Sequence, residues 1–189
     1  MSELIKDIIK PENNLENAII ADPEFIEGAN WGKSRRGHPE GKVIYHIKEV
    51  LENIDEWYFD YYKRSQLRIL AILHDTFKHK VNRDEPKTGE NHHGMIARRF
   101  AEKFEGHLKI SNEILTILEH HDDAYNAWSK GNRRGDWVGA EKRATKLLET
   151  LQNEDALDLF IDFYDCDNAT GNKASDDFTW FMNFIESES

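Results

Sequence analysis

Residues 65–78 have the sequence SQLRILAILHDTFK, and this stretch decides the fold that we expect. Its middle is apolar nearly all the way round a helix, which is typical of a central, buried helix. A buried strand is the alternative, but the length of the stretch and the flanking polar residues Gln66 and Arg68 favour a helix over residues 65–76. The apolar run ends in His74 and Asp75, so an imidazole and a carboxylate stand at the end of the most apolar helix.

Segments on both sides of this stretch show further helical patterns. Apolar residues recur at spacings of three and four over residues 42–54, which predicts an amphipathic helix. Glycine and proline favour loops over residues 28–41, 78–90 and 130–136. Because no alternating strand pattern of useful length is present, the expected fold class is all-α, a single-domain helical bundle. The other expected helices cover residues 2–9, 13–20, 93–104, 111–120, 141–151, 155–165 and 176–185.

Composition restricts the class of protein. The chain has 189 residues and a net charge of -11, from 36 acidic and 25 basic residues, so broad attraction to long nucleic acid is not expected. A local basic patch can still receive a small phosphorylated ligand. The one cysteine, Cys166, cannot form an intrachain disulfide. Since no apolar run approaches the roughly 20 residues that span a bilayer and residues 1–10 do not resemble a signal peptide, we expect a cytoplasmic protein with no membrane partner.

Histidine and aspartate residues gather at the ends of the expected core helices. His46 lies within the helix over 42–54, His74 and Asp75 end the central helix, and His120–Asp123 end another. Burial of such groups without partners is costly, so they satisfy one another or a cation satisfies them together. A mixed shell of imidazole nitrogen and carboxylate oxygen suits a divalent metal ion, but it does not distinguish Mn, Co, Ni, Fe, Mg or Zn.

The spacing of these residues resembles a known family. His46, then His74-Asp75 after 28 residues, then a late helical aspartate, is similar to the HD superfamily of metal-dependent phosphohydrolases. The segment Leu73–Lys78 resembles the apolar-His-Asp-x-Gly-Lys segment of that family, with Phe77 where glycine is usual. The resemblance implies an HD-type helical domain over residues 1–189, with a helical and loop lead-in at about 1–41.

Two shorter stretches carry a more local resemblance. Residues 37–46 and 91–94 are similar to the HD domain of CCA-adding tRNA nucleotidyltransferases, although the nucleotidyltransferase domain is absent. The chain therefore looks like a stand-alone HD protein of the bacterial and phage type.

The resemblance also implies a set of metal ligands. His46, His74, Asp75 and Asp167 would hold one cation, with Asp165 as the second choice for the last ligand. Two further histidines, His93 and either His120 or His121, would hold a second cation or contact phosphate directly.

Other residues are expected to bind substrate. Lys78, a few residues after His74, is placed to neutralise phosphate charge, and Arg35 and Arg36 in the glycine-rich loop offer the same chemistry. Trp31 would stack on a base or pack the loop. Asp75, or a nearby carboxylate, would accept the proton of the attacking water.

The function expected from these residues is a metal-dependent phosphohydrolase. Its substrate would be a small nucleotide or a related phosphate ester: a monophosphate, a triphosphate or a cyclic diester. The alternative is a non-catalytic sensor that binds metal or nucleotide, because the bulk of Phe77 would crowd the site. A third hypothesis is an interaction protein with structural histidines, and a homo-oligomer is left open.

Overall fold

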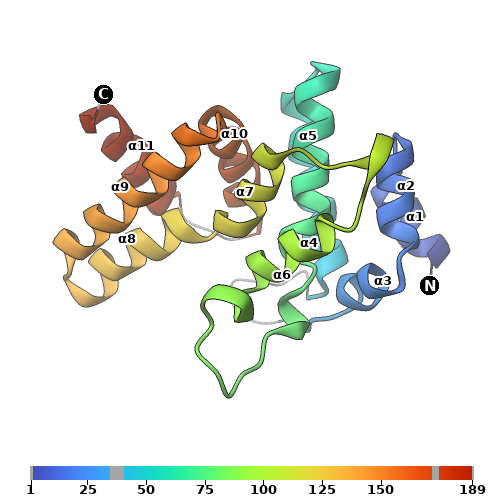
Figure 1. Cartoon of the computed structure of the whole chain (residues 1–189), viewed down its shortest axis with the longest axis horizontal. Coiled ribbons are helices and arrows are strands. Elements are labelled where there is room, and N and C mark those ends of the chain that lie inside the picture. The colour runs from blue at the N-terminus through green and yellow to red at the C-terminus, as the bar shows by residue number, and fades with distance from the viewer. Residues whose placement is uncertain (1, 35–40, 172–174, 189) are drawn as a thin grey trace.

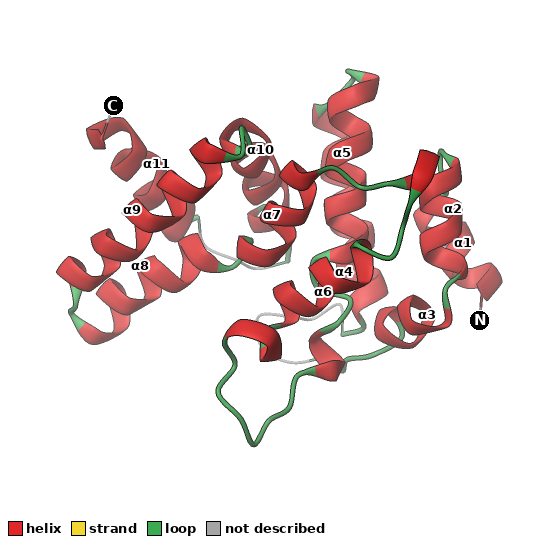
Figure 2. Ribbon diagram, viewed as in Figure 1, coloured by secondary structure: helices red, strands yellow, loops and turns green. Residues whose placement is uncertain are grey.

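The chain folds into helices joined by loops (Figures 1 and 2). The computed structural model describes residues 2–34, 41–171 and 175–188, and in these ranges no strand forms apart from an isolated antiparallel bridge between Gly32 and Lys42. The all-α fold class is therefore confirmed. The helices are α1 (Ser2–Ile9), α2 (Asn14–Ala21), α3 (Pro23–Ala29), α4 (Val43–Trp57), α5 (Tyr61–Leu73), α6 (His93–Ala101), α7 (Asn112–His120), α8 (Asp123–Arg134), α9 (Trp137–Asn153), α10 (Leu157–Asn168) and α11 (Asp176–Glu188).

Helix α5 lies at the centre of the fold, as its apolar sequence predicts. Residues 67–73 are all buried, and the helix packs against α4, α7 and α10. In Figure 1 it stands between α1–α3 on one side and α7–α11 on the other. Because the central helix ends at Leu73, His74 and Asp75 are delivered directly into the interior of the protein.

The expected loop over residues 130–136 is wrong over residues 130–134, which are helical. Helix α8 continues through this stretch to Arg134 and ends at Gly135, whose φ of 69° suits glycine. Gly131 leaves room for the ring of Trp137, which lies directly against it: a Cβ atom there would come 2.2 Å from Cε3 of Trp137. A glycine that a sequence pattern assigns to a loop serves here as a packing site for the α8–α9 hairpin.

A buried ion pair fastens the N-terminal helices to α5. Arg68 is 1% exposed and Glu16 is 0% exposed, and Nη2 of Arg68 donates to Oε2 of Glu16 at 2.9 Å. The same guanidinium donates to the carbonyl of Ile9 at 3.0 Å, which is near the end of α1. Glu16 also accepts from the side chain of Asn13, which caps α2. One cation thus holds α1 and α2 against the central helix.

None of the described helices is both long enough and apolar enough to cross a membrane.

We predict that Arg68→Met lowers the free energy of unfolding by about 3–5 kcal/mol, because the buried carboxylate of Glu16 loses its partner. Arg64→Met is the matched control. Arg64 lies one turn earlier on α5 and binds Glu12 and Asp55, but its side chain is partly exposed, so the loss should stay within about 1 kcal/mol. Urea denaturation measures both, and equal losses would contradict the role of the buried pair.

Candidate metal centre

Histidines and aspartates from separate helices converge beneath the surface. His46 comes from the first turn of α4, His74 and Asp75 follow α5, and His93 begins α6. All four side chains are buried. The remaining members are His121, which follows α7, and Asp167, which lies near the end of α10.

The first group of donors surrounds a pair of imidazoles. Nε2 of His46 lies 3.1 Å from Nε2 of His74, and 2.9 Å from Oδ1 of Asp167. Oδ2 of Asp75 lies 3.7 Å from both of these nitrogens. A cation about 2.1 Å from each ligand separates neighbouring ligand atoms by about 3.0–3.4 Å, so these spacings suit a single ion.

A second group repeats this arrangement on the other side of Asp75. Nε2 of His93 lies 3.0 Å from Nε2 of His121, and the two nitrogens lie 3.5 and 3.6 Å from Oδ1 of Asp75. Oδ2 of Asp122 lies 3.3 Å from Nε2 of His93. The carboxylate of Asp75 therefore turns one oxygen to each histidine pair, which is the geometry of a bridging ligand.

Backbone contacts set the protonation of two of these imidazoles. Nδ1 of His74 lies 3.1 Å from the carbonyl oxygen of Ala71, and Nδ1 of His121 lies 2.8 Å from that of Leu118. Since a carbonyl only accepts, each Nδ1 carries the hydrogen, and whenever the ring is neutral its Nε2 turns a lone pair into the centre. A metal ligand needs this tautomer, with its other nitrogen donating to the protein.

The nitrogen and oxygen atoms that face the centre therefore offer more lone pairs than there are N–H hydrogens to pair with them. A cation site must meet this condition. Around His74, bare Nε2 faces two carboxylate oxygens, and burial lowers the pKa of its ring to about 4, so it is neutral near pH 7. Burial disfavours the charged form of His121, but Asp122 and Asp75 outweigh it and raise its pKa to about 9. A proton on that ring occupies the position of a cation and leaves when one binds. The residues fit a divalent metal ion.

Lys78 lies at the edge of this centre. Its ammonium group contacts Oδ2 of Asp75 at 2.5 Å. Burial opposes its charge, but Asp75 and Asp122 outweigh burial and raise the pKa of Lys78 above its ordinary value. Burial would also raise the pKa of Asp75, yet Lys78 and His74 hold it well below the usual range. Both groups are charged, and the lysine stands where the centre meets the cavities.

The structure distinguishes the two candidates for the closing aspartate. Asp167 turns toward His46, with its Oδ1 2.9 Å from Nε2 of that residue, and this contact favours Asp167. It also distinguishes the two adjacent histidines. His121 faces Asp75, but Nδ1 of His120 lies 2.7 Å from Oδ2 of Asp123, outside both nitrogen pairs.

Phe77 does not occupy the position that a crowding role requires. Its ring is fully buried and packs against Phe100 with 4.7 Å between ring centres. It lines neither of the cavities next to the centre. The ring of Phe77, at the position where the family usually has glycine, therefore fills the core beneath α6. The argument that its bulk crowds the site, which had favoured a sensor, is wrong. Arg35 and Arg36 lie outside the described residues.

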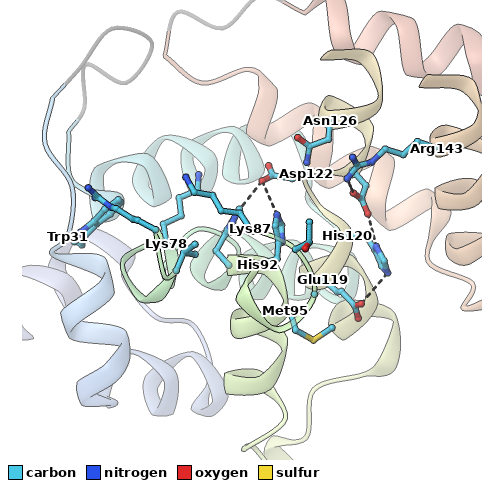
Figure 3. A pocket seen from close by; sticks show the side chains of 16 residues that line it. Trp31, Lys78, Lys87, His92, Met95, Glu119, His120, Asp122, Asn126 and Arg143 are labelled. Atoms are coloured by element: carbon cyan, nitrogen blue, oxygen red, sulfur yellow. Dashed lines mark hydrogen bonds and ion pairs between the residues drawn. The ribbon is translucent and has the colours of Figure 1, made fainter. Parts of the chain in front are cut away.

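Two cavities open onto the centre. The larger, about 790 Å³, is bordered by His93 and Asp122, and the smaller, about 430 Å³, by His46 and Asp75. Figure 3 shows the larger cavity, with Trp31 at one end, Lys78 beside it, and Asn126 and Arg143 at the other end. The basic side chains that line one or both cavities are Lys33, Lys42, Lys78, Arg83, Lys87 and Arg143.

Sequence reasoning missed several of these residues. Asp122 follows His121 at the end of an apolar helix just as Asp75 follows His74, and that repeated pattern was a usable signal. His92, which the sequence analysis did not assign to the site, lines the larger cavity and accepts from the backbone N–H of Gly94. The cavity residues Arg83, Lys87 and Arg143 carry no local pattern that marks them.

A family model for the HD domain matches residues 43–159. The chain belongs to the HD-domain family. The matched span of this HD-domain protein contains both histidine pairs and Asp75, while Asp167 follows it. The family implies the superfamily of metal-dependent phosphohydrolases, and the His/Asp groups are able to hold a divalent metal. No match was found among curated proteins or solved structures. The likeness to CCA-adding enzymes stays a prediction.

We predict that Asp167→Asn weakens binding of the first divalent cation at least about tenfold, because the nitrogen pair of His46 and His74 loses its carboxylate. Asp165→Asn, two residues away, is the matched control and should bind as the parent does. Titration calorimetry with Mn²⁺ measures both. Weakening by Asp165→Asn alone would reassign the ligand.

The two histidines after α7 supply a second comparison. His121→Ala should remove one of two bound cations per chain, because His121 faces the bridging carboxylate. His120→Ala should keep both, because that ring is held by Asp123. Elemental analysis after dialysis against trace metal gives the stoichiometry. A single cation in the parent protein that His121→Ala leaves in place would show that His93 and His121 do not form a metal site.

Proposed function

We propose that this HD-domain protein is a metal-dependent phosphohydrolase that acts on a small nucleotide or a related phosphate ester. The observation that carries the proposal is the arrangement of Asp75 between two pairs of imidazoles whose Nε2 atoms face each other. The acceptor-rich centre lies at the floor of cavities lined by lysine and arginine. A structural histidine cluster would have no need of that opening.

The assignment of ligands follows the two groups of donors. His46, His74, Asp75 and Asp167 would hold the first cation, and Asp75, His93 and His121 the second. A divalent cation lowers the pKa of water and polarises phosphoryl oxygens. Side chains of the protein would bind the substrate and accept the proton.

The cavity walls supply positive charge for the substrate. Lys78 ends its side chain at the centre, between the two cavities, where it can pair with a phosphoryl oxygen. Arg83 also lines both cavities, and a guanidinium binds phosphate with two parallel hydrogen bonds. Trp31 borders both cavities as well and offers an indole surface for a base.

Proton transfer needs a carboxylate that faces the substrate. Both oxygens of Asp75 are directed at the histidine pairs, and its side chain is only 9% exposed. Asp122 lines the larger cavity with a side chain that is 35% exposed, beside His93. We therefore assign to Asp122 the role of accepting the proton of the attacking water.

The proposal predicts phosphate-ester hydrolysis that depends on a divalent cation. The purified chain, supplied in turn with Mn, Co, Ni and Mg, should hydrolyse at least one member of a panel of nucleotides and phosphodiesters. His74→Ala should abolish the activity, because its lone pair belongs to the first cation site. Liquid chromatography of the products measures both.

The outcomes separate the hypotheses. Activity that survives His74→Ala comes from a contaminant or another site and would contradict the assignment. Bound metal and bound nucleotide without turnover would favour the sensor. If the protein shows no metal binding and no turnover, the result would favour a structural role for the histidines.

A further inference from the structure

The two cavities open onto different ligands of the proposed metal centre. The smaller contains His46, a ligand of the first proposed cation, and the larger contains His93, a ligand of the second. Asp75 bridges these two sites, with one oxygen toward each. Lys78 contacts Asp75 and borders both cavities, so a phosphorus atom beside Lys78 would be adjacent to both of them.

The cavities meet at a narrow set of shared residues. Trp31, Lys78 and Arg83 border both of them. The positively charged side chains of Lys78 and Arg83 suit a phosphate group at this junction between the cavities. A phosphate at this point has one ester oxygen free to lead into each cavity.

Each cavity is large enough to hold a substituent of its own. Ligand pockets in proteins measure about 300–1,000 Å³, and the cavities measure about 430 and 790 Å³. A phosphate monoester carries one substituent and would leave one cavity filled with water. A phosphate substituted on two sides would fill both.

The linings of the two cavities differ. The smaller is walled by Gly32, Gly41 and Lys42, where two chain segments are joined by the backbone bridge and where both glycines have positive φ. The larger presents the thioether of Met95 and the amide of Asn126 (Figure 3). Met95 and Asn126 lie on different walls of this cavity, so a group between them would meet an apolar surface on one side and a hydrogen-bonding amide on the other, which suits the ring of a nucleobase.

We propose that the substrate is a phosphate with an organic group on each side, a phosphodiester or phosphoanhydride, and that Asn126 reads the group in the larger cavity. This inference rests on the proposed function. In the reaction, the oxygen of water bonds to phosphorus and the bond to one bridging oxygen breaks, leaving its electron pair on that oxygen. One proton of water ends on the leaving oxygen and the other stays with the new phosphate.

The test compares substrates with the same chromophore. Thymidine 5'-monophosphate 4-nitrophenyl ester carries two groups, and 4-nitrophenyl phosphate carries one. The first should be hydrolysed with a kcat/KM at least about tenfold higher. Dithymidine diphosphate, an anhydride, is assayed in parallel, and its products show whether the diester or the anhydride bond is cleaved.

Binding supplies a readout that does not depend on turnover. Calorimetry should show that a thymidine dinucleoside phosphorothioate binds at least about tenfold more tightly than thymidine 5'-monophosphorothioate. Tighter binding of the dinucleotide is informative because it carries less negative charge than the monophosphorothioate. Electrostatic attraction alone would therefore make the monophosphorothioate bind more tightly.

A matched pair of variants tests the larger cavity. Asn126→Leu should weaken binding of the dinucleotide about tenfold, whereas Asn132→Leu, an exposed asparagine on the same helix outside both cavities, should not. Faster hydrolysis or tighter binding of the monoester would overturn the inference while leaving the phosphohydrolase intact. Failure to hydrolyse any of these esters with any cation would remove the proposed function and the inference with it.

Discussion

The carboxylate of Asp75 is the constraint on which the rest of the structure depends. Its two oxygens face two pairs of buried imidazoles, so four separate helix positions must bring nitrogen to one point. Burial of that many polar groups is affordable only when each has a partner. The backbone carbonyls of α5 and α7 orient His74 and His121, and Lys78 balances the charge at the rim. The helix ends meet where they do because this cluster has to be satisfied.

The parts of the fold that follow from local sequence were the ones predicted well. The apolar run of α5 indicates a buried helix because no face of it suits water, and it carries His74 and Asp75 to its end. The loop assigned to residues 130–136 fails for the opposite reason. Whether Gly131 breaks a helix depends on what packs against it, and the ring of Trp137 belongs to the next helix. Tertiary contact decides such a position, and local propensity does not.

In the candidate site too, local sequence predicts some residues, and others depend on tertiary contacts. His46 stands on the buried face of an amphipathic helix, and the resemblance to a family already pointed to Asp167. It is harder to predict which of two adjacent histidines faces the centre, because successive residues on a helix point in directions about 100° apart. His121 enters the centre and His120 leaves it, although His121 has the same 28-residue separation from His93 that His74 has from His46. The cavity walls are assembled from segments distant in sequence, so no local pattern marks Arg83 or Arg143.

The charge of the chain sets a last physical problem, because a protein of net charge -11 repels phosphates at long range. Screening limits this repulsion to about 8 Å at physiological ionic strength, so distant carboxylates contribute little inside a cavity. Within that distance the relevant groups are those lining it. Asp123 is paired with Arg143, while Lys78 and Arg83 line both cavities. Bound cations would add further positive charge there. Lysine and arginine side chains outnumber carboxylates in the two linings, so the balance of charge there is opposite to that of the whole chain. The basic residues are Lys33, Lys42, Lys78, Arg83, Lys87 and Arg143, and the acidic ones are Asp75, Glu119, Asp122 and Asp123.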